Sequence, residues 1–318
     1  MDYYYQNKEE ISKKLLALNG ILVALIFMMC TMIYGASQKP KQVANVIDAQ
    51  PIATTTPFDT LDLKAKAVYV YDVAEGKVLY KKNEFAQLPL ASITKLMMAL
   101  TATELLPKDS KITIKKEFLE EEGDTGLLAN ESWTLRDLLD FSLVASSNDG
   151  ARSIASVVGA FDLQNDDFDL GRKDFITKMN LRAQELGLKQ TYFINESGLD
   201  VGSASGGYGS AIDVEKLMQY ILQNKPDILE ATKFQKVTVD SLSNLQHTAK
   251  NTNIDVGNIP GLLASKTGFT DSAGGNLAVA FDASIGHPII VVVLGSTIEG
   301  RFQDVSSLVK ASFEYAGQ

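Results

Sequence analysis

The spacing of apolar residues changes along the chain and divides it into regions. Residues 15–34 are apolar almost without interruption, and about 20 helical residues are enough to cross the hydrocarbon layer of a membrane. We therefore predict a transmembrane helix over 15–36. Bulky Tyr34 fits an uncleaved signal anchor better than a signal peptide with its small-residue cleavage site. Residues 37–62 are rich in proline, threonine and small polar residues without an apolar period, which predicts a linker.

From residue 65 the pattern becomes that of a folded domain. Residues 65–83 alternate β-branched and aromatic residues around a polar turn at 74–77, which predicts a β-hairpin. Apolar residues then follow helical spacing, so that much of 92–230 is predicted to be helical. The helical stretches are 88–107, 133–159 and 174–188, the later strand-like runs are 262–269, 276–283 and 288–296, and a closing helix is expected at 301–316.

Two early strands and three late strands predict a mixed α/β (α+β) fold. We expect one antiparallel five-stranded sheet flanked by helices, with a mostly helical lobe inserted between its second and third strands. A cleft between the sheet lobe and the helical lobe is the natural place for a functional site.

Charge and composition then remove several classes of function. The chain has 318 residues, a formal net charge of −9 and no basic stripe, so nucleic acid is not an expected partner. Its two histidines, His247 and His287, are far apart in sequence and lack ligand spacing, so we expect no metal, no other cofactor and no Ser-His-Asp relay. The single cysteine, Cys30, lies in the N-terminal apolar run, and a cysteine-free body suits an extracytoplasmic location.

The stretch LPLASITKLMMAL, residues 88–100, carries the first candidate chemistry. It predicts the start of a helix that is apolar on almost every side, with Ser92 and Lys95 one turn apart on one face. A serine hydroxyl is a weak nucleophile that needs a base, and a lysine in water is protonated at neutral pH. Desolvation lowers the pKa of lysine, so a buried Lys95 could accept the proton of Ser92.

A Ser-x-x-Lys motif alone is weak, because a second copy, Ser307 to Lys310, is interpreted as a solvated helix surface. Two further motifs follow the first copy in order: Ser146-Ser147-Asn148 after an amphipathic helix, and Lys266-Thr267-Gly268 in the first late strand. Taken singly, the former could be a helix cap or turn and the latter an edge strand protected by a lysine. The order of the three motifs and the element in which each falls argue against both interpretations. Gly268 would let a ligand backbone approach closely.

This trio resembles that of the penicillin-binding proteins and β-lactamases. The longer stretches around it are similar to the D-alanyl-D-alanine carboxypeptidases, the low-molecular-weight serine penicillin-binding proteins, over nearly all of 63–315. The similar stretches include VYDVAEGKVLYKKNEFAQLPLASITKLMMAL, GDTGLLANESWTLRDLLDFSLVASSND, LRAQELGLKQTYFINESGLD, KTGFTDSAGGNLAVAF and VVVLGSTIEGRFQDV. The resemblance implies the penicillin-binding transpeptidase-like fold.

The resemblance also implies the reaction. Ser92 would attack the carbonyl between two D-alanines of a peptidoglycan stem peptide, Lys95 would take its proton, and water would later release the acyl group. Ser146 would pass a proton to the departing D-alanine, and Asn148 would hold the peptide. β-Lactam antibiotics should acylate Ser92, because they present the same acyl-donor geometry.

The remaining implied roles concern the late strand and the last helix. Lys266 and Thr267 would bind the terminal carboxylate. The backbone N–H groups of Ser92 and Phe269 would form an oxyanion hole. Arg301 matches a family arginine near the carboxylate, although a surface salt bridge would explain it equally well.

Two departures from the family pattern stand out. Many members have a β-rich domain and an amphipathic anchor after the catalytic domain, whereas this chain stops at Gln318, so we expect the N-terminal helix to replace that anchor. Phe269 stands where the family often has histidine or tyrosine. Because only its backbone N–H is needed, we expect altered substrate preference rather than inactivity.

Three rival interpretations remain. A class A β-lactamase would need a glutamate that activates the deacylating water, for which Glu196 is the nearest candidate, although its surroundings resemble the carboxypeptidases. A D,D-endopeptidase that cuts peptidoglycan cross-links would use the same machinery. A wall-binding module with a relaxed site would be no enzyme at all, and the intact trio argues against it.

The expected organisation is a cytoplasmic tail at 1–14, a membrane anchor at 15–36, a linker at 37–62 and a catalytic domain at 63–318. Lysines flank both ends of the apolar run, so charge alone does not orient it. The enzymatic interpretation places the catalytic domain outside the cytoplasm.

Overall fold

The computed structural model describes the backbone of residues 2–36 and 56–317, and the side chains of 15–32 and 56–317. The chain divides into two units, residues 1–54 and 55–318. Most of the predicted linker lies outside the described residues. In the first unit, the helix α1 (Asp2–Ala36) contains an apolar stretch, Leu15–Met32, of a length and hydropathy sufficient to cross a membrane. The same features occur in uncleaved anchors and in signal sequences.

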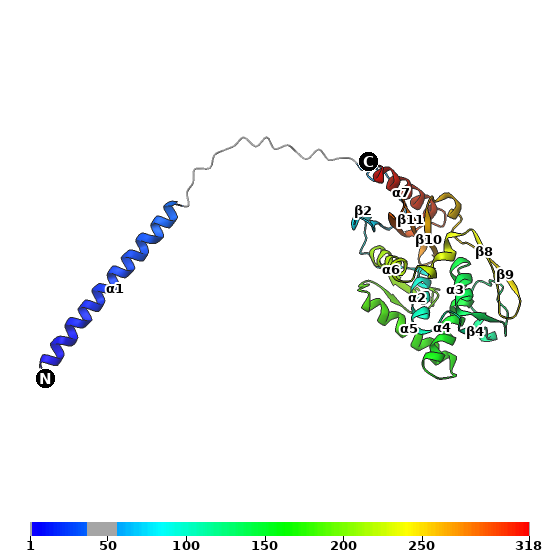
Figure 1. The fold of residues 1–318 in the computed structure, drawn as a ribbon, viewed down its shortest axis with the longest axis horizontal. Coiled ribbons are helices and arrows are strands. Elements are labelled where there is room, and N and C mark those ends of the chain that lie inside the picture. Colours follow the sequence, from blue (N-terminus) through cyan, green and yellow to red (C-terminus); the bar gives the residue numbers. More distant parts are fainter. Residues whose placement is uncertain (1, 37–55, 318) are drawn as a thin grey trace. The chain divides into compact units, whose positions relative to one another are not determined.

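The second unit is built on a five-stranded antiparallel sheet (Figure 1). Its strand order is β10-β11-β12-β1-β2, which places the first two strands of the chain beside the last three. The predicted sheet, and the insertion between its second and third strands, are confirmed. The strands are β1 (Ala67–Asp72), β2 (Lys77–Lys82), β10 (Leu262–Thr270), β11 (Gly274–Asp282) and β12 (Pro288–Ser296).

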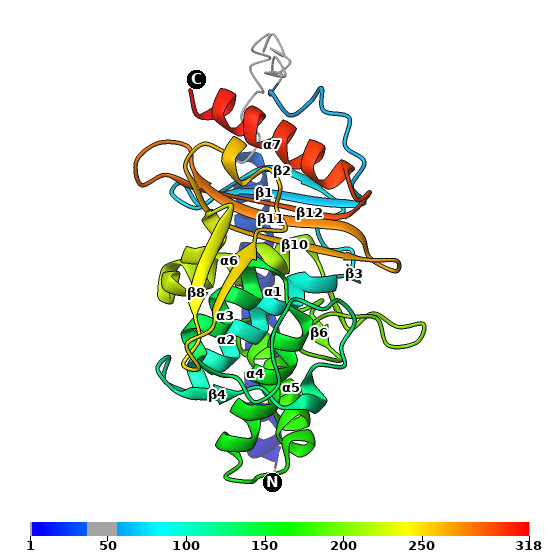
Figure 2. The same cartoon turned by 90° about the vertical axis from the view of Figure 1, so that its right-hand side faces the viewer.

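Both faces of this sheet are covered, which explains why its inner strands read as continuous apolar runs. Side chains alternate along β12, so that Val291 and Val293 face the helix α7 (Gly300–Ala316), while Ile290 and Val292 face the helical lobe. Figure 2 shows α7 along one face of the sheet and the helical lobe on the other. The alternation therefore builds two apolar clusters, one on each side.

The insertion forms a mostly helical lobe, as predicted, with short strands at its margins. A hairpin, β8 and β9, follows α6, the last α-helix of this lobe, and was not expected from the sequence. The helices are α2 (Lys95–Leu105), α3 (Leu135–Val144), α4 (Asn148–Asp162), α5 (Phe168–Glu185) and α6 (Ala211–Asn224), and the strands are β3 (Leu88–Pro89), β4 (Lys111–Thr113), β5 (Ser132–Thr134), β6 (Tyr192–Phe193), β7 (Gly207–Gly209), β8 (Lys236–Asp240) and β9 (Gln246–Lys250).

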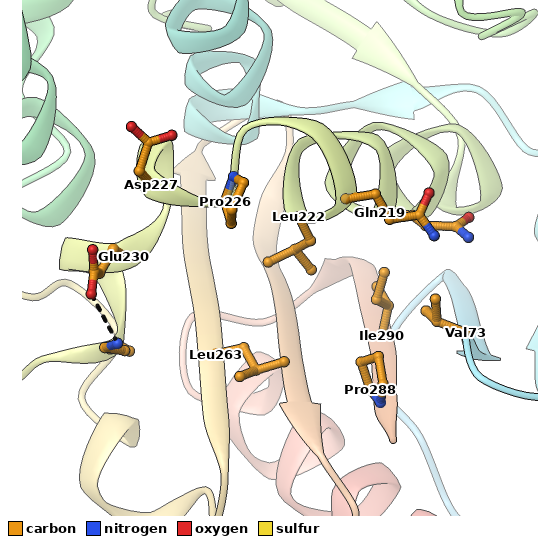
Figure 3. A pocket seen from close by; sticks show the side chains of 11 residues that line it. Val73, Gln219, Leu222, Pro226, Asp227, Glu230, Leu263, Pro288 and Ile290 are labelled. Carbon is orange, nitrogen blue, oxygen red and sulfur yellow. Dashed lines mark hydrogen bonds and ion pairs between the residues drawn. The ribbon is translucent and has the colours of Figure 1, made fainter. Parts of the chain in front are cut away.

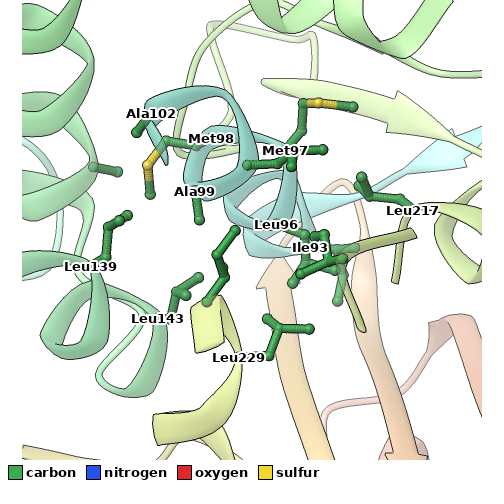
Figure 4. Close-up of a cluster of buried hydrophobic side chains, with 14 of the residues drawn as sticks. Ile93, Leu96, Met97, Met98, Ala99, Ala102, Leu139, Leu143, Leu217 and Leu229 are labelled. Atoms are coloured by element: carbon green, nitrogen blue, oxygen red, sulfur yellow. The ribbon is translucent and has the colours of Figure 1, made fainter. Parts of the chain in front are cut away.

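Helix α2 runs through the middle of this lobe. Every residue from Lys95 to Ala102 is buried, as expected for a helix that is apolar all round. Figure 4 shows its side chains meeting leucines of α3 and α6, together with Leu229. Lys95, at the first position of this helix, is fully inaccessible to solvent.

The start of α2 differs from the expected helix over 88–107. The short strand β3 comes first, then a 3₁₀ turn, Ala91–Thr94, and only then the α-helix from Lys95. A 3₁₀ turn has three residues per turn, so residues i and i+3 lie directly above one another. The side chains of Ser92 and Lys95 therefore point in more nearly the same direction than they would on a regular α-helix.

Candidate active site

Ser92 is held in a strained turn beside the sheet. Ala91 has φ +47°, a left-handed conformation that costs a non-glycine residue about 1–2 kcal/mol. Asn276, buried in β11, offsets this cost by donating from Nδ2 to the carbonyl oxygens of Pro89 (2.9 Å) and Leu90 (3.0 Å). The Leu90 N–H donates in turn to the Gly207 carbonyl oxygen. The segment before Ser92 is thus fixed from two sides.

The Lys95 amine contacts three oxygen atoms. Its Nζ lies 2.9 Å from Ser92 Oγ, 2.7 Å from Asn148 Oδ1 and 2.9 Å from the Ser197 carbonyl oxygen. A neutral amine has two N–H donors and one lone pair. The Asn148 oxygen and the Ser197 carbonyl can only accept, so a neutral Lys95 has its lone pair left for the Ser92 hydroxyl proton. This arrangement fits a base and nucleophile.

Burial lowers the pKa of Lys95 to about 7, because the charged ammonium loses its hydration; the carboxylates of Glu196 and Glu121 act in the opposite direction. Lys95 is completely inaccessible to solvent. A substantial fraction of this amine is therefore neutral near neutral pH, as the sequence hypothesis requires.

Ser146 sits at the junction of α3 and α4 in a conformation that glycine usually takes. Its φ is +58°, and the Ser147 N–H donates to the Ser142 carbonyl oxygen at 3.0 Å, which is the closing bond of a Schellman motif. Ser147 then caps α4 by accepting from the Gly150 N–H at 3.0 Å. The tight junction turns the Ser146 hydroxyl toward β10 and puts Asn148 on the first turn of α4.

A second lysine and serine pair lies beside the first. Lys266 Nζ, on β10, contacts Ser146 Oγ and the Thr267 carbonyl oxygen, both at 2.9 Å. Burial lowers the pKa of Lys266 well below its ordinary value, and the nearby cations Lys95 and Arg301 lower it further. Thr267 Oγ1 contacts Thr252 Oγ1 at 2.5 Å, a partner that no sequence pattern indicated.

The structure gives a reason for a glycine at position 268 that differs from the predicted close approach of a ligand. A Cβ at this position would lie 2.7 Å from the Leu90 carbonyl oxygen and 3.2 Å from the Ser92 backbone nitrogen. The close approach is therefore that of the chain's own nucleophile turn. Phe269 follows with its side chain largely exposed at the rim of the site.

Arg301 is buried and makes no surface salt bridge among the described residues, so that alternative is wrong. Its Nη1 donates to the Gly268 carbonyl oxygen at 2.8 Å. Because this bond holds the strand that carries Lys266 and Thr267, Arg301 belongs to the same cluster. The structure thus brings all nine predicted site residues together from α2, α4, β10 and α7 and the turns before them.

Glu196 is the residue that the β-lactamase interpretation would require, and it is fully buried. Arg172 Nε lies 3.1 Å and 2.9 Å from its two carboxylate oxygens. The same loop contacts β10 further on, where Asp200 accepts from the Thr270 hydroxyl at 3.1 Å. This loop therefore connects the Lys95 environment to the end of the Lys266 strand.

Other sequence candidates lie apart from the site. Ser307 and Lys310 are exposed on α7, as predicted for a solvated surface. His247 Nε2 lies 2.7 Å from Glu131 Oε1, and His287 Nε2 lies 2.7 Å from Asp72 Oδ2. With Glu75, the latter pair places three possible metal-ligand atoms within 4.8 Å of one another, and the hydrogen bond between Asp72 and His287 accounts for the proximity of two of them.

A cavity of about 490 Å³ lies between α6 and the starts of β10 and β12 (Figure 3). Leu222, Leu263 and Ile290 point into it, and none of the nine predicted site residues lines it. The chemistry is therefore separate from this cavity.

Comparison with known proteins identifies the family. The family model described as D-alanyl-D-alanine carboxypeptidase matches residues 52–297. The chain belongs to the D-alanyl-D-alanine carboxypeptidase family. A carboxypeptidase of Bacillus subtilis, DacF, is 30% identical over 79% of this chain and 62% of its own length, so this family member spans less than two thirds of that relative. A D-alanyl-D-alanine endopeptidase of Pseudomonas aeruginosa is 30% identical over 73% of this chain and 72% of its own length.

The fold comparison agrees with this assignment. Penicillin-binding protein D2 of Listeria monocytogenes, in its ampicillin-bound form, superposes with a TM-score of 0.67 and 31% identity over 80% of this carboxypeptidase family member and 99% of that chain. The predicted fold class and family are confirmed.

Proposed function

We propose that this chain is a serine-type D-alanyl-D-alanine carboxypeptidase that removes the terminal D-alanine from peptidoglycan stem pentapeptides. The observation that carries the proposal is the contact of 2.9 Å between Ser92 Oγ and the Nζ of a fully buried Lys95. Family membership supplies the substrate class, and the names of the related proteins support it.

The acylation step begins at Ser92. Lys95 takes the hydroxyl proton as Ser92 Oγ forms a bond to the carbonyl carbon of the penultimate D-alanine. The C–N bond to the terminal D-alanine then breaks, and Ser146 hands a proton to the leaving nitrogen. Lys266, which contacts Ser146 Oγ, is placed to restore that proton. Water later attacks the ester, which releases the shortened peptide and regenerates the Ser92 hydroxyl.

Binding groups surround this centre. Asn148 would hold the peptide beside Lys95, and Lys266 and Thr267 would hold the terminal carboxylate, whose negative charge favours a protonated Lys266. Arg301 would add positive charge near this carboxylate, and its hydrogen bond to the Gly268 carbonyl oxygen would hold the strand that binds it. The N–H groups of Ser92 and Phe269 would stabilise the oxyanion, for which one donor is worth about 3 kcal/mol.

Labelling with a β-lactam tests the nucleophile. The full chain should form a covalent adduct with a fluorescent penicillin, and Ser92→Ala should abolish it. Ser307→Ala is a matched control, because it removes the serine of the exposed second Ser-x-x-Lys and should leave labelling unchanged. Labelling that survives in Ser92→Ala would contradict the proposal.

A D,D-endopeptidase activity is the second candidate, because relatives with that name match this chain at similar identity. Incubation with a pentapeptide and, separately, with a cross-linked dimer distinguishes the two. Release of D-alanine from the pentapeptide supports the carboxypeptidase, whereas conversion of the dimer alone supports the endopeptidase.

Membrane attachment is part of the proposal. The apolar stretch of α1 would anchor residues 15–36, residues 1–14 would face the cytoplasm, and residues 37–62 would link the anchor to a catalytic domain at 63–318 outside the membrane. The length and hydropathy of Leu15–Met32 support the anchor, and the family's cell-wall substrate supports the orientation. Protease accessibility of the body in intact spheroplasts tests it.

A further inference from the structure

An ion pair between a fully buried carboxylate and a half-buried arginine lies one residue away from a backbone contact of Lys95. Glu196 is fully inaccessible to solvent and is held by Arg172 Nε, at 2.9 Å and 3.1 Å from its two oxygens. The next residue, Ser197, offers its carbonyl oxygen to Lys95 Nζ at 2.9 Å. The loop that contacts the base therefore also carries a buried negative charge, and Arg172 reaches it from α5.

This charge opposes the function of Lys95. A buried carboxylate is poorly screened by salt and favours the protonated amine, which is not a base. Glu196 and Glu121 both raise the pKa of Lys95 against the effect of burial. The charged groups that face Lys95 from the surrounding elements are Glu196 with its partner Arg172, Glu121 with its partners Arg152 (2.7 Å) and Arg172 (3.8 Å), and Lys266 of β10.

We propose that Arg172 is a positioning residue of the active site: its ion pair with Glu196 fixes the loop against Lys95, and its positive charge offsets part of the stabilisation that the carboxylate gives to the ammonium form. The inference rests on the proposed function, in which Lys95 must be neutral to accept the Ser92 proton. No group of the reacting substrate needs to touch Arg172. Its effect is therefore on the pH dependence of acylation rather than on substrate binding.

The pH profile of acylation by a fluorescent penicillin, measured on the full chain in detergent, tests this inference. Arg172→Met leaves Glu196 uncompensated, so the midpoint of the acid limb should move up by about one pH unit, which is about a tenfold loss of rate below the midpoint. Arg172→Lys keeps the charge and should retain most of the wild-type profile. Glu196→Gln removes the negative charge and should move the midpoint the opposite way.

A matched control comes from the same helix. Arg182 pairs with Glu104 (2.9 Å) and Glu185 (2.8 Å) at the surface, and Arg182→Met should leave the midpoint unchanged. Removing one partner of a buried pair destabilises proteins strongly, so Arg172→Met could fail to fold. Glu196→Gln leaves no buried carboxylate unpaired, and Arg172, which is 24% exposed, keeps Glu121 at 3.8 Å, so the midpoint of this variant then decides alone.

Opposite shifts for Arg172→Met and Glu196→Gln support the inference. An equal loss of rate at every pH in Arg172→Met, or an unchanged or raised midpoint in Glu196→Gln, overturns it. Failure of the wild-type chain to form an adduct at Ser92 would instead refute the proposed function.

Discussion

Replacing Ser146 by glycine and by alanine should separate the strain at this position from its chemistry. Its φ of +58° closes the Schellman motif between α3 and α4, and its hydroxyl contacts Lys266 Nζ at 2.9 Å. Both substitutions delete the hydroxyl and leave Lys266 with the same lost contact. Only glycine also removes the steric conflict of a Cβ in the left-handed region.

The magnitude follows from two opposing terms. Relief of the left-handed strain is worth about 1–2 kcal/mol. Glycine also has more conformational freedom than alanine in the unfolded chain, which destabilises the folded state by about 0.4–1 kcal/mol relative to alanine. We therefore expect Ser146→Gly to be more stable than Ser146→Ala by about 1 kcal/mol, or by about 2 °C in Tm for a domain of this size.

Thermal unfolding of the full chain in detergent, followed by circular dichroism, measures this difference. Penicillin labelling and D-alanine release, measured in parallel, should be reduced in both variants to the same degree, because both lack the proton-transferring hydroxyl. Equal Tm values, or a higher Tm for the alanine variant, would contradict the claim that a side chain at position 146 strains the backbone. Wild-type D-alanine release in either variant would refute the chemical role.

Three further predictions concern buried positions. Burial raises the pKa of Glu215 to about 7 from 4.5, so stability that is present below pH about 4.5 is lost as pH rises through about 7. Glu215→Gln should therefore be more stable than wild type by about 3 kcal/mol at alkaline pH and similar in acid, as measured by urea unfolding. Gly268→Ala should reduce penicillin acylation at least about tenfold and destabilise the fold by about 1–3 kcal/mol, because its Cβ would lie 2.7 Å from the Leu90 carbonyl oxygen; wild-type acylation would contradict this. Asn276→Ala removes the donor to the Pro89 and Leu90 carbonyl oxygens and the acceptor of the Gly295 N–H. It should cost about 1–3 kcal/mol in urea unfolding, an effect that an unchanged midpoint would exclude.

The sheet and most helices were predictable because their signals are local. The alternation in 65–83 and the apolar run of β12 reflect which faces are buried, and both elements form where expected. The start of α2 was misplaced, because apolar spacing does not distinguish a 3₁₀ turn from the first turn of an α-helix. The hairpin of β8 and β9 alternates buried and exposed residues too weakly to be seen in the sequence.

The site could be predicted as a set of motifs but not as a network. Ser92, Lys95 and Lys266 stand in short recognisable patterns. Their partners come from far along the chain: the Ser197 carbonyl contacts Lys95 across 102 residues. Backbone acceptors have no sequence signature, and nothing in the sequence distinguishes Arg172 from the other four arginines until the fold brings it to Glu196. Asn276, which holds the turn before Ser92 from β11, was likewise not indicated by the sequence.

The central claim is that Lys95 is a neutral base near neutral pH. Titration of its side chain tests this most directly, by ¹³C NMR of the full chain with its lysines labelled at Cε. The signal that is missing from the spectrum of Lys95→Arg identifies Lys95. We expect a midpoint near 7, because burial disfavours the charged ammonium. A midpoint at the ordinary lysine value of 10.5 would contradict it.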